Sequence, residues 1–320
     1  MKAFNRINLP MRQKVAIIGA GYVGASIAYA LMIRRLAKEI VLIDKLKDRA
    51  IGEARDIRHG IPFVGTSNIY AGEYSNCVDS DLIIITAGRN RKPNETRLDM
   101  AADNISIVHE VIQELKKYYT TGVIMVVSNP VDIIVQKCTE WMELPDGVVF
   151  GTGCILDTSR LINYVADYVG LNTEVISGFV YGEHGDMQIP MWSRVSVAGV
   201  PIEGYCYAIG LEFGDAQKKE IAYKVKKAGI EIIKGKGRTH YGIATCVCYL
   251  ADAILNRRTI IASVSSTLRG EYNIENVALS IPSIIGSSGV ERRIQESLNV
   301  SESDYLYKAS KQLKNVLVNL

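Results

Sequence analysis

The segment Lys14-Val-Ala-Ile-Ile-Gly19-Ala-Gly21-Tyr-Val-Gly24 decides the expected fold of this chain. Lys14 to Gly19 is a short run rich in branched apolar side chains, which is typical of a buried strand, and a helical pattern follows from Ala25 to Arg35. Gly19 permits a tight turn, Gly21 lets the backbone approach a pyrophosphate, and Gly24 lets the helix pack closely on the strand. The free N–H groups of the helix then face the phosphates.

A second apolar run, Glu39 to Ile43, ends at Asp44, twenty residues after Gly24. An acid at this distance accepts hydrogen bonds from ribose hydroxyls and repels a 2′-phosphate, so the arrangement predicts NAD rather than NADP. A glycine pattern alone is weak evidence, because a flexible loop also explains it. Strand, helix, second strand and acid in register favour the dinucleotide site.

Apolar runs and helical patterns continue to alternate after Asp44. This alternation predicts an α/β fold with an N-terminal doubly wound parallel sheet of the Rossmann type. We expect an NAD-binding domain over residues 1–152 and a mixed α+β substrate domain over residues 153–320. Further strands are expected at Asp81–Ala87, Val123–Val127, Val148–Phe150, Val175–Tyr181 and Val195–Val200, and helices at Arg97–Tyr118, 131–141, Asp157–Val169, Asp215–Gly235, Gly242–Asn256 and Ser301–Leu320.

Composition narrows the class of protein. A net charge of +3 over 320 residues is too small to favour nucleic acid or an acidic membrane surface as a partner. The six cysteines include no C-x-x-C pair, so we expect reduced thiols, no metal site and a cytoplasmic protein. The uncharged stretch Val15–Ile33 resembles a signal peptide, but three glycines interrupt it, and we expect neither secretion nor membrane insertion.

Two short segments carry side chains suited to catalysis. His184 lies in Val180–Asp186 with glycine on both sides of its turn, so a ligand could approach the imidazole, although a loop histidine is more often structural. Asp157 and Arg160 share one face of a helix. They could form a plain ion pair, or Asp157 could hold His184 while Arg160 grips a carboxylate. Spacing does not choose between these.

A basic loop, Gly88–Arg97, contains three arginines and one lysine. It could be a solvated loop or a contact for the cofactor phosphates. Alternatively, it could be a lid that closes cations over an anionic substrate and excludes water.

Several motifs together resemble the lactate/malate dehydrogenase family over essentially the whole chain. They are Gly19–Gly24 with Asp44, Ser128-Asn-Pro-Val-Asp132, Gly151-Thr-Gly with Leu156-Asp-Thr-Ser-Arg160, and Gly182-Glu-His-Gly-Asp186. The resemblance implies that His184 exchanges the substrate proton, that Asp157 orients His184, and that Arg160 binds the substrate carboxylate. It also implies that Arg97 polarises the substrate carbonyl, that Asn129 lies beside the hydroxyl and that Thr239 lines the pocket.

The same resemblance implies the cofactor contacts and the assembly. We expect the protein to bind NAD, to act on a small-molecule substrate and to form a homotetramer or a homodimer. The expected cofactor contacts are Gly19, Gly21, Tyr22, Val23, Gly24, Asp44, Ala87, Gly88, Asn104, Val127 and Asn129.

One lid position largely separates the two substrates in the family, which has glutamine there for lactate and arginine for malate. Arg91 occupies it here. A buried second carboxylate needs a counter-charge, so we predict malate and oxaloacetate as the substrate pair. The alternative is L-lactate and pyruvate, because Gly182–Asp186 and the lid flank Lys92–Asp99 look more like bacterial lactate dehydrogenases. A non-catalytic NAD-binding sensor is the remote alternative.

The resemblance also bears on regulation. Many bacterial lactate enzymes bind fructose 1,6-bisphosphate between subunits through an arginine and a histidine, at positions that are Ile162 and Ser177 in this chain. Neither side chain can bind phosphate strongly. We therefore predict no activation by this sugar bisphosphate.

Overall fold

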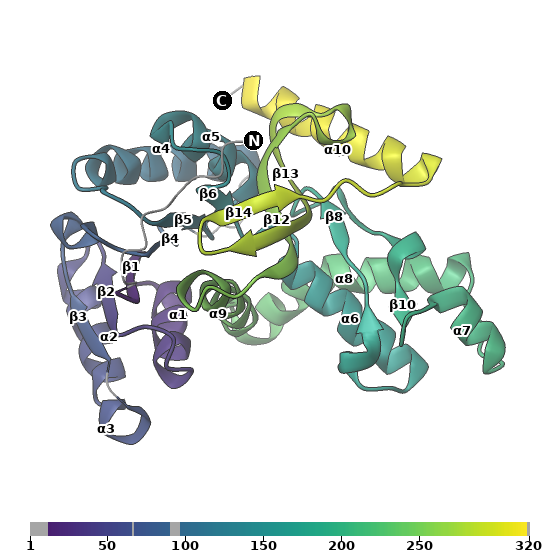
Figure 1. Cartoon of the computed structure of the whole chain (residues 1–320), viewed down its shortest axis with the longest axis horizontal. Helices are drawn as coiled ribbons and strands as arrows, with labels where there is room; N and C mark the ends of the chain where they lie inside the picture. Colours follow the sequence, from purple (N-terminus) through teal and green to yellow (C-terminus); the bar gives the residue numbers. More distant parts are fainter. Residues whose placement is uncertain (1–11, 66, 90–96, 319–320) are drawn as a thin grey trace.

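The computed structural model describes residues 12–65, 67–89 and 97–318 (Figure 1). In its N-terminal half the strands pair parallel with one another. This confirms the predicted doubly wound Rossmann sheet. In spatial order the strands are β3 (Asn68–Ala71), β2 (Glu39–Ile43), β1 (Lys14–Ile18), β4 (Leu82–Ile85), β5 (Val123–Val126) and β6 (Val149–Gly151).

Both faces of this sheet are covered by helices (Figure 1). Alternate residues of β1 point to opposite sides: Val15 and Ile17 pack in one apolar cluster, Ala16 and Ile18 in another. The first cluster contains α1 (Tyr22–Ile33) and α9 (Tyr241–Leu255), and the second contains α4 (Arg97–Lys116) and α5 (Val131–Met142). Burial on both faces explains why these strands are apolar throughout.

The sheet continues into the C-terminal half of the chain. Strand β6 pairs antiparallel with β12 (Ile260–Arg269), through Gly151 opposite Ser265. Beyond β12 lie β13 (Glu275–Gly286), β8 (Val180–Gly182) and β9 (Gln188–Pro190), and β14 (Gly289–Arg293) pairs with β13. One sheet therefore runs through both halves.

The C-terminal half also carries a small second sheet, made of β7 (Ile176–Ser177), β10 (Ser196–Val197) and β11 (Val200–Pro201). The expected strand over Val175–Tyr181 was wrong in extent. It is divided between β7 in the small sheet and β8 in the large one, because the chain passes from one sheet to the other. The expected strand over Val195–Val200 is likewise two short strands, β10 and β11.

Helices also pack against strands of the C-terminal half. The expected helices in the C-terminal half are present, with ends shifted by a few residues at most. The elements not yet named are α2 (Lys47–Arg58), α3 (Ile61–Val64), α6 (Ile155–Val169), α7 (Ile202–Ala208), α8 (Asp215–Lys236) and α10 (Val300–Val318), and four short 3₁₀ segments at Tyr74–Cys77, Thr173–Val175, Trp192–Arg194 and Glu271–Asn273.

The stretch Val15–Ile33 forms β1, the glycine turn and α1. Within the described residues no helix is both long and apolar enough to cross a bilayer. All six cysteines are buried and unpaired. No cluster of histidine, cysteine or acidic side chains suited to a metal ion occurs in the described part of the chain.

Candidate functional site

The turn between β1 and α1 has the geometry of a phosphate-binding loop. Gly19 has φ +109°, which glycine adopts without strain. A Cβ atom at Gly24 would lie 1.9 Å from the carbonyl oxygen of Gly19, so only glycine lets the helix approach this closely. A Cβ at Gly21 would meet nothing within 4 Å, so open space faces the start of α1. A pyrophosphate fits this cradle, with the first N–H groups of the helix as donors.

Asp44 is fixed beside this turn, at the end of β2. Its Oδ2 atom accepts a hydrogen bond from the Ala20 N–H at 2.8 Å, and Oδ1 accepts one from the Leu46 N–H at 2.8 Å. Each carboxylate oxygen retains a lone pair. The acid is therefore held where ribose hydroxyls could donate to it.

The ends of β4 and β5 lie next to the glycine turn. The Thr86 hydroxyl donates to the Gly19 carbonyl at 2.8 Å, and the Ser128 hydroxyl donates to the Ala87 carbonyl at 2.5 Å. Buried Asn104 donates to the Asn129 carbonyl at 2.7 Å and accepts from the Arg89 N–H at 2.8 Å. Of the predicted cofactor residues, Asn104 thus braces the backbone after both strands. Ala87, Gly88, Val127 and Asn129 lie at these strand ends.

His184, Asp157 and Arg160 come together at the start of α6. Asp157 Oδ2 lies 2.6 Å from His184 Nδ1, and Asp157 Oδ1 accepts a hydrogen bond from Arg160 Nη1 at 2.8 Å. Asp157 is fully buried, whereas 25% of the His184 side chain is exposed. One carboxylate oxygen of Asp157 thus forms the ion pair with Arg160, and the other contacts His184. Binding of a substrate carboxylate by Arg160 stays a prediction.

Charge pairing outweighs burial in this trio. Burial favours the neutral form of Asp157, but His184 and Arg160 hold the pKa of that carboxyl below its ordinary value. Burial likewise lowers the pKa of His184, yet the neighbouring carboxylate of Asp157 raises it above its ordinary value. An imidazole that readily takes up a proton faces solvent on one side and a fixed anion on the other.

Asp132 is a site residue to which the sequence analysis gave no role. It lies in the first turn of α5, and its Oδ2 accepts the backbone N–H of His184 at 2.7 Å. Burial raises the pKa of Asp132 to about 7. The only sequence signal was an acid in an apolar helix, within the Ser128–Asp132 motif.

For three predicted substrate residues the structure shows no contact with His184, Asp157 or Arg160. Arg91 lies outside the described residues, as does the side chain of Arg97, whose backbone begins α4. Thr239 is half-buried between α8 and α9. Its role as a pocket residue stays a prediction.

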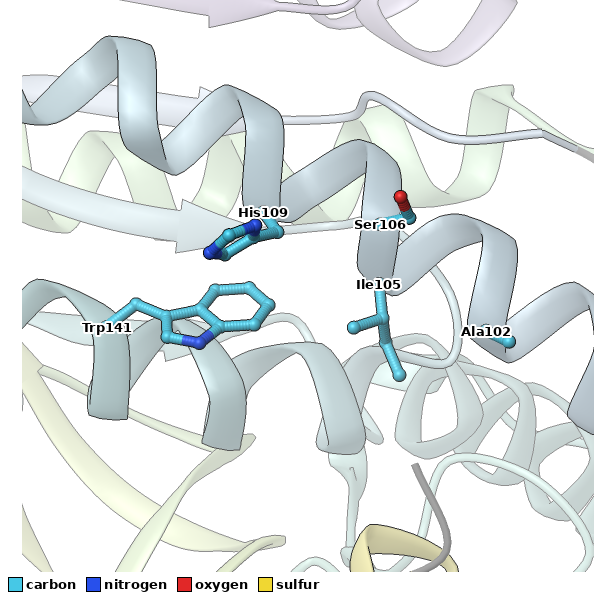
Figure 2. A pocket seen from close by; sticks show the side chains of 5 residues that line it. All are labelled: Ala102, Ile105, Ser106, His109 and Trp141. Atoms are coloured by element: carbon cyan, nitrogen blue, oxygen red, sulfur yellow. The ribbon is translucent and has the colours of Figure 1, made fainter.

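A surface hollow of about 350 Å³ lies elsewhere, between α4 and α5 (Figure 2). The rings of His109 and Trp141 meet there edge to face, with centroids 4.7 Å apart. Ala102, Ile105 and Ser106 complete the lining. None of the predicted catalytic or cofactor residues lines this hollow, so it is separate from the site around His184.

Comparison with known sequences agrees with the geometry. Residues 13–151 match the profile described as lactate/malate dehydrogenase, NAD binding domain, and residues 154–319 match lactate/malate dehydrogenase, alpha/beta C-terminal domain. The L-lactate dehydrogenase of Thermoanaerobacter pseudethanolicus is 39% identical over 307 residues, covering 96% of this chain and 99% of the relative. That of Clostridium perfringens is 39% identical over 306 residues, covering 96% of each.

Solved structures give the same result. The minor L-lactate dehydrogenase from Enterococcus mundtii superposes with a TM-score of 0.93 at 36% identity, covering 97% of this chain and 99% of the other. The L-lactate dehydrogenase from Clostridium thermocellum gives a TM-score of 0.86 at 44% identity, covering 97% and 99%.

Proposed function

Because this chain belongs to the lactate/malate dehydrogenase family and uses NAD, we propose that it interconverts a 2-hydroxy acid and its 2-keto acid, with His184 as the proton-exchanging residue. The observation that carries the proposal is the shared carboxylate of Asp157, which binds His184 and Arg160 at once. A non-catalytic NAD sensor would have no need of a buried acid that raises the pKa of a partly exposed imidazole.

His184 acts as the base when the hydroxy acid is oxidised. With Nδ1 donating to Asp157, the other ring nitrogen is free to accept the hydroxyl proton. Asp157 stabilises the imidazolium that results. In the reverse direction the protonated ring returns its proton to the substrate oxygen.

Arg160 holds the substrate carboxylate. One of its N–H groups is used by Asp157, and the planar guanidinium keeps further donors for a bidentate contact. This contact would fix the orientation of the carbon that reacts. Arg97 would polarise the keto oxygen as negative charge develops there, as predicted from the sequence.

The chain's own groups fit NAD at the β1–α1 turn. The glycine cradle accommodates the pyrophosphate, and Asp44 receives ribose hydroxyls. NAD, when bound, takes up or supplies the hydride that the protein cannot.

Two substrate pairs are supported by different observations. L-Lactate and pyruvate are supported by the relatives, which carry the name L-lactate dehydrogenase over nearly the whole length of this chain. Malate and oxaloacetate, the pair predicted from the sequence, rest on Arg91 alone. Overall similarity is the broader support, whereas Arg91 is the position that would meet the group by which the two acids differ.

The test is the loss of NADH absorbance when purified protein is mixed with pyruvate or with oxaloacetate. Oxidation with either acid, lost in a His184→Asn variant, supports the proposal, and the larger kcat/KM identifies the pair. No turnover with either acid would refute it and favour an NAD sensor.

Regulation and assembly stay predictions. Ile162 lies on α6 and Ser177 is exposed on β7, and neither can bind phosphate strongly. We expect the KM for the keto acid to be unchanged across a titration with fructose 1,6-bisphosphate, and a clear drop would contradict this. A homotetramer or homodimer in a cytoplasmic setting is expected by resemblance, and sedimentation would measure the assembly.

A further inference from the structure

Arg238 stacks on the cofactor turn from the opposite half of the chain. Its guanidinium carbon lies 3.7 Å from the centre of the Tyr22 ring, and Tyr22 is the first residue of α1. Arg238 follows the end of α8, so the contact joins segments more than two hundred residues apart. Tyr22 is 61% exposed, so the ring offers Arg238 a platform on the open side of the turn.

The segment around Arg238 is anchored to α1. His240 Nδ1 and the Ser26 hydroxyl lie 2.9 Å apart, and the His240 ring lies 5.9 Å from that of Tyr22. Ser26 is one turn further along α1 than Tyr22. This hydrogen bond ties the segment that carries Arg238 to α1.

Two cations of this segment, Arg238 and Lys236, lie over aromatic rings. Within the described residues no carboxylate pairs with Arg238 or with Lys236, whose ammonium lies 4.0 Å from the Tyr241 ring centre. The pKa of His240 is lowered by burial and by the charges of Lys236 and Arg238. A guanidinium that stacks on a ring keeps its N–H donors and can still bind an anion.

The nearest built site for an anion is the start of α1. The helix N–H groups and the open space at Gly21 fit a pyrophosphate there. The chain's NAD-binding domain implies that the pyrophosphate of NAD binds at this turn. We propose that Arg238 binds the pyrophosphate of NAD, so that the C-terminal half grips the cofactor together with the glycine turn. This inference rests on the proposed function only for where the cofactor lies.

Two ligands distinguish binding of the pyrophosphate by Arg238 from a purely structural role of this side chain. ADP-ribose carries the pyrophosphate without the nicotinamide, whereas adenosine carries neither phosphate. Calorimetric titration of the full-length protein, without keto acid, measures both. We expect Arg238→Ala to weaken ADP-ribose about tenfold, because an arginine–phosphate contact is charge-assisted, and to leave adenosine within about twofold. Arg238→Lys should lie between Arg238→Ala and wild type for ADP-ribose.

Lys236→Ala is the matched control, since it removes a cation of the same segment that stacks on Tyr241 instead of on the glycine turn. Both ligands should bind it within about twofold of wild type. Unchanged ADP-ribose affinity in Arg238→Ala would overturn the proposal. Equal weakening of adenosine and ADP-ribose would also overturn it, because the change would then be a loss of local structure.

These measurements require no turnover. Failure of the protein to reduce any 2-keto acid would refute the proposed function and leave the ADP-ribose comparison intact.

Raised ionic strength gives a second readout. The difference in ADP-ribose affinity between wild type and Arg238→Ala should narrow as salt screens the contact. A gap that does not change with salt would argue against a charge contact.

Discussion

The backbone N–H of His184 donates to Oδ2 of Asp132 at 2.7 Å, so a buried acid on α5 fixes the turn that carries the imidazole. The Ser265 hydroxyl near this carboxyl and the His184 N–H favour its charged form, but burial has the larger effect. An ionised carboxylate in this environment is costly, and burial raises the pKa of Asp132 to about 7.

Asp132→Asn should become more stable relative to wild type as the pH rises. The folded-state pKa is raised above the unfolded value of about 3.9, so wild type loses stability between that pH and about 7. Asparagine keeps an acceptor for the His184 N–H and carries no charge. Urea unfolding at several pH values measures the difference.

The control for this experiment is Asp252→Asn, which alters an aspartate that is also largely buried but is paired with Arg258. Urea unfolding of this variant over the same pH range shows how stability changes when a buried but ion-paired aspartate is replaced in the same way. If the free energy of unfolding depends on pH in the same way in Asp132→Asn and in wild type, Asp132 is ionised in the folded protein over the whole pH range, and the prediction is wrong.

Asp157→Asn should lower kcat for keto-acid reduction by roughly 100-fold or more, because the imidazolium loses its anion. The pH profile should also move. The raised pKa of His184 keeps it protonated, and reduction active, above its usual titration range near 6.5. In Asp157→Asn, the pH above which the reduction rate falls should shift to lower values.

The reverse reaction needs neutral His184, so its rising limb should shift to lower pH in the same variant. Steady-state rates in both directions across pH measure the two limbs, with Asp252→Asn as the control that leaves them in place. A slower variant with unchanged limbs would mean that Asp157 does not set the proton affinity of His184.

Arg160→Lys should raise the KM for the keto acid roughly 10-fold to 100-fold, since an ammonium keeps the charge but cannot make the bidentate contact. Substrate titration at saturating NADH measures it. Arg258→Lys, at the Asp252 pair on α9, is the matched control and should leave the KM unchanged. A fall in kcat with an unchanged KM would indicate that Arg160 serves only to orient Asp157.

Arg91→Gln should raise the ratio of kcat/KM for pyruvate over oxaloacetate by roughly 100-fold or more, because the second carboxylate loses its counter-charge. Lys92→Gln removes the neighbouring cation of the Gly88–Arg97 segment and should change that ratio little. An equal change of this kcat/KM ratio in both variants would mean that the Gly88–Arg97 segment attracts anions in general and that Arg91 does not discriminate between the two acids.

The N-terminal sheet was predictable because its signals are local. Lys14–Gly24 and Asp44 carry strand, turn, helix and acid in one continuous segment, and burial on both faces makes the strands uniformly apolar. Strands β12 and β13 were not predicted. Buried hydroxyl residues such as Ser263 and Thr267 interrupt the apolar pattern of β12. Their hydrogen-bond partners, the Val180 carbonyl and the Gln136 side chain, lie far away in the sequence.

The site was predictable in part for the same reason. Asp157 and Arg160 are three residues apart on one helix, so their pairing could be anticipated. Contact with His184 bridges 27 residues, and only resemblance to a family indicated it. Asp132 was missed because it holds a backbone N–H 52 residues away, which no side-chain pattern reveals.

The pairing of Gly151 with Ser265 limits how this protein can move. A hydrogen-bonded sheet does not bend at a ladder as a flexible linker does, so the halves cannot swing apart like the jaws of a hinged enzyme. Any closure over His184 must then come from segments that do not belong to this sheet. Such a closure would be a rearrangement of short segments against a rigid sheet.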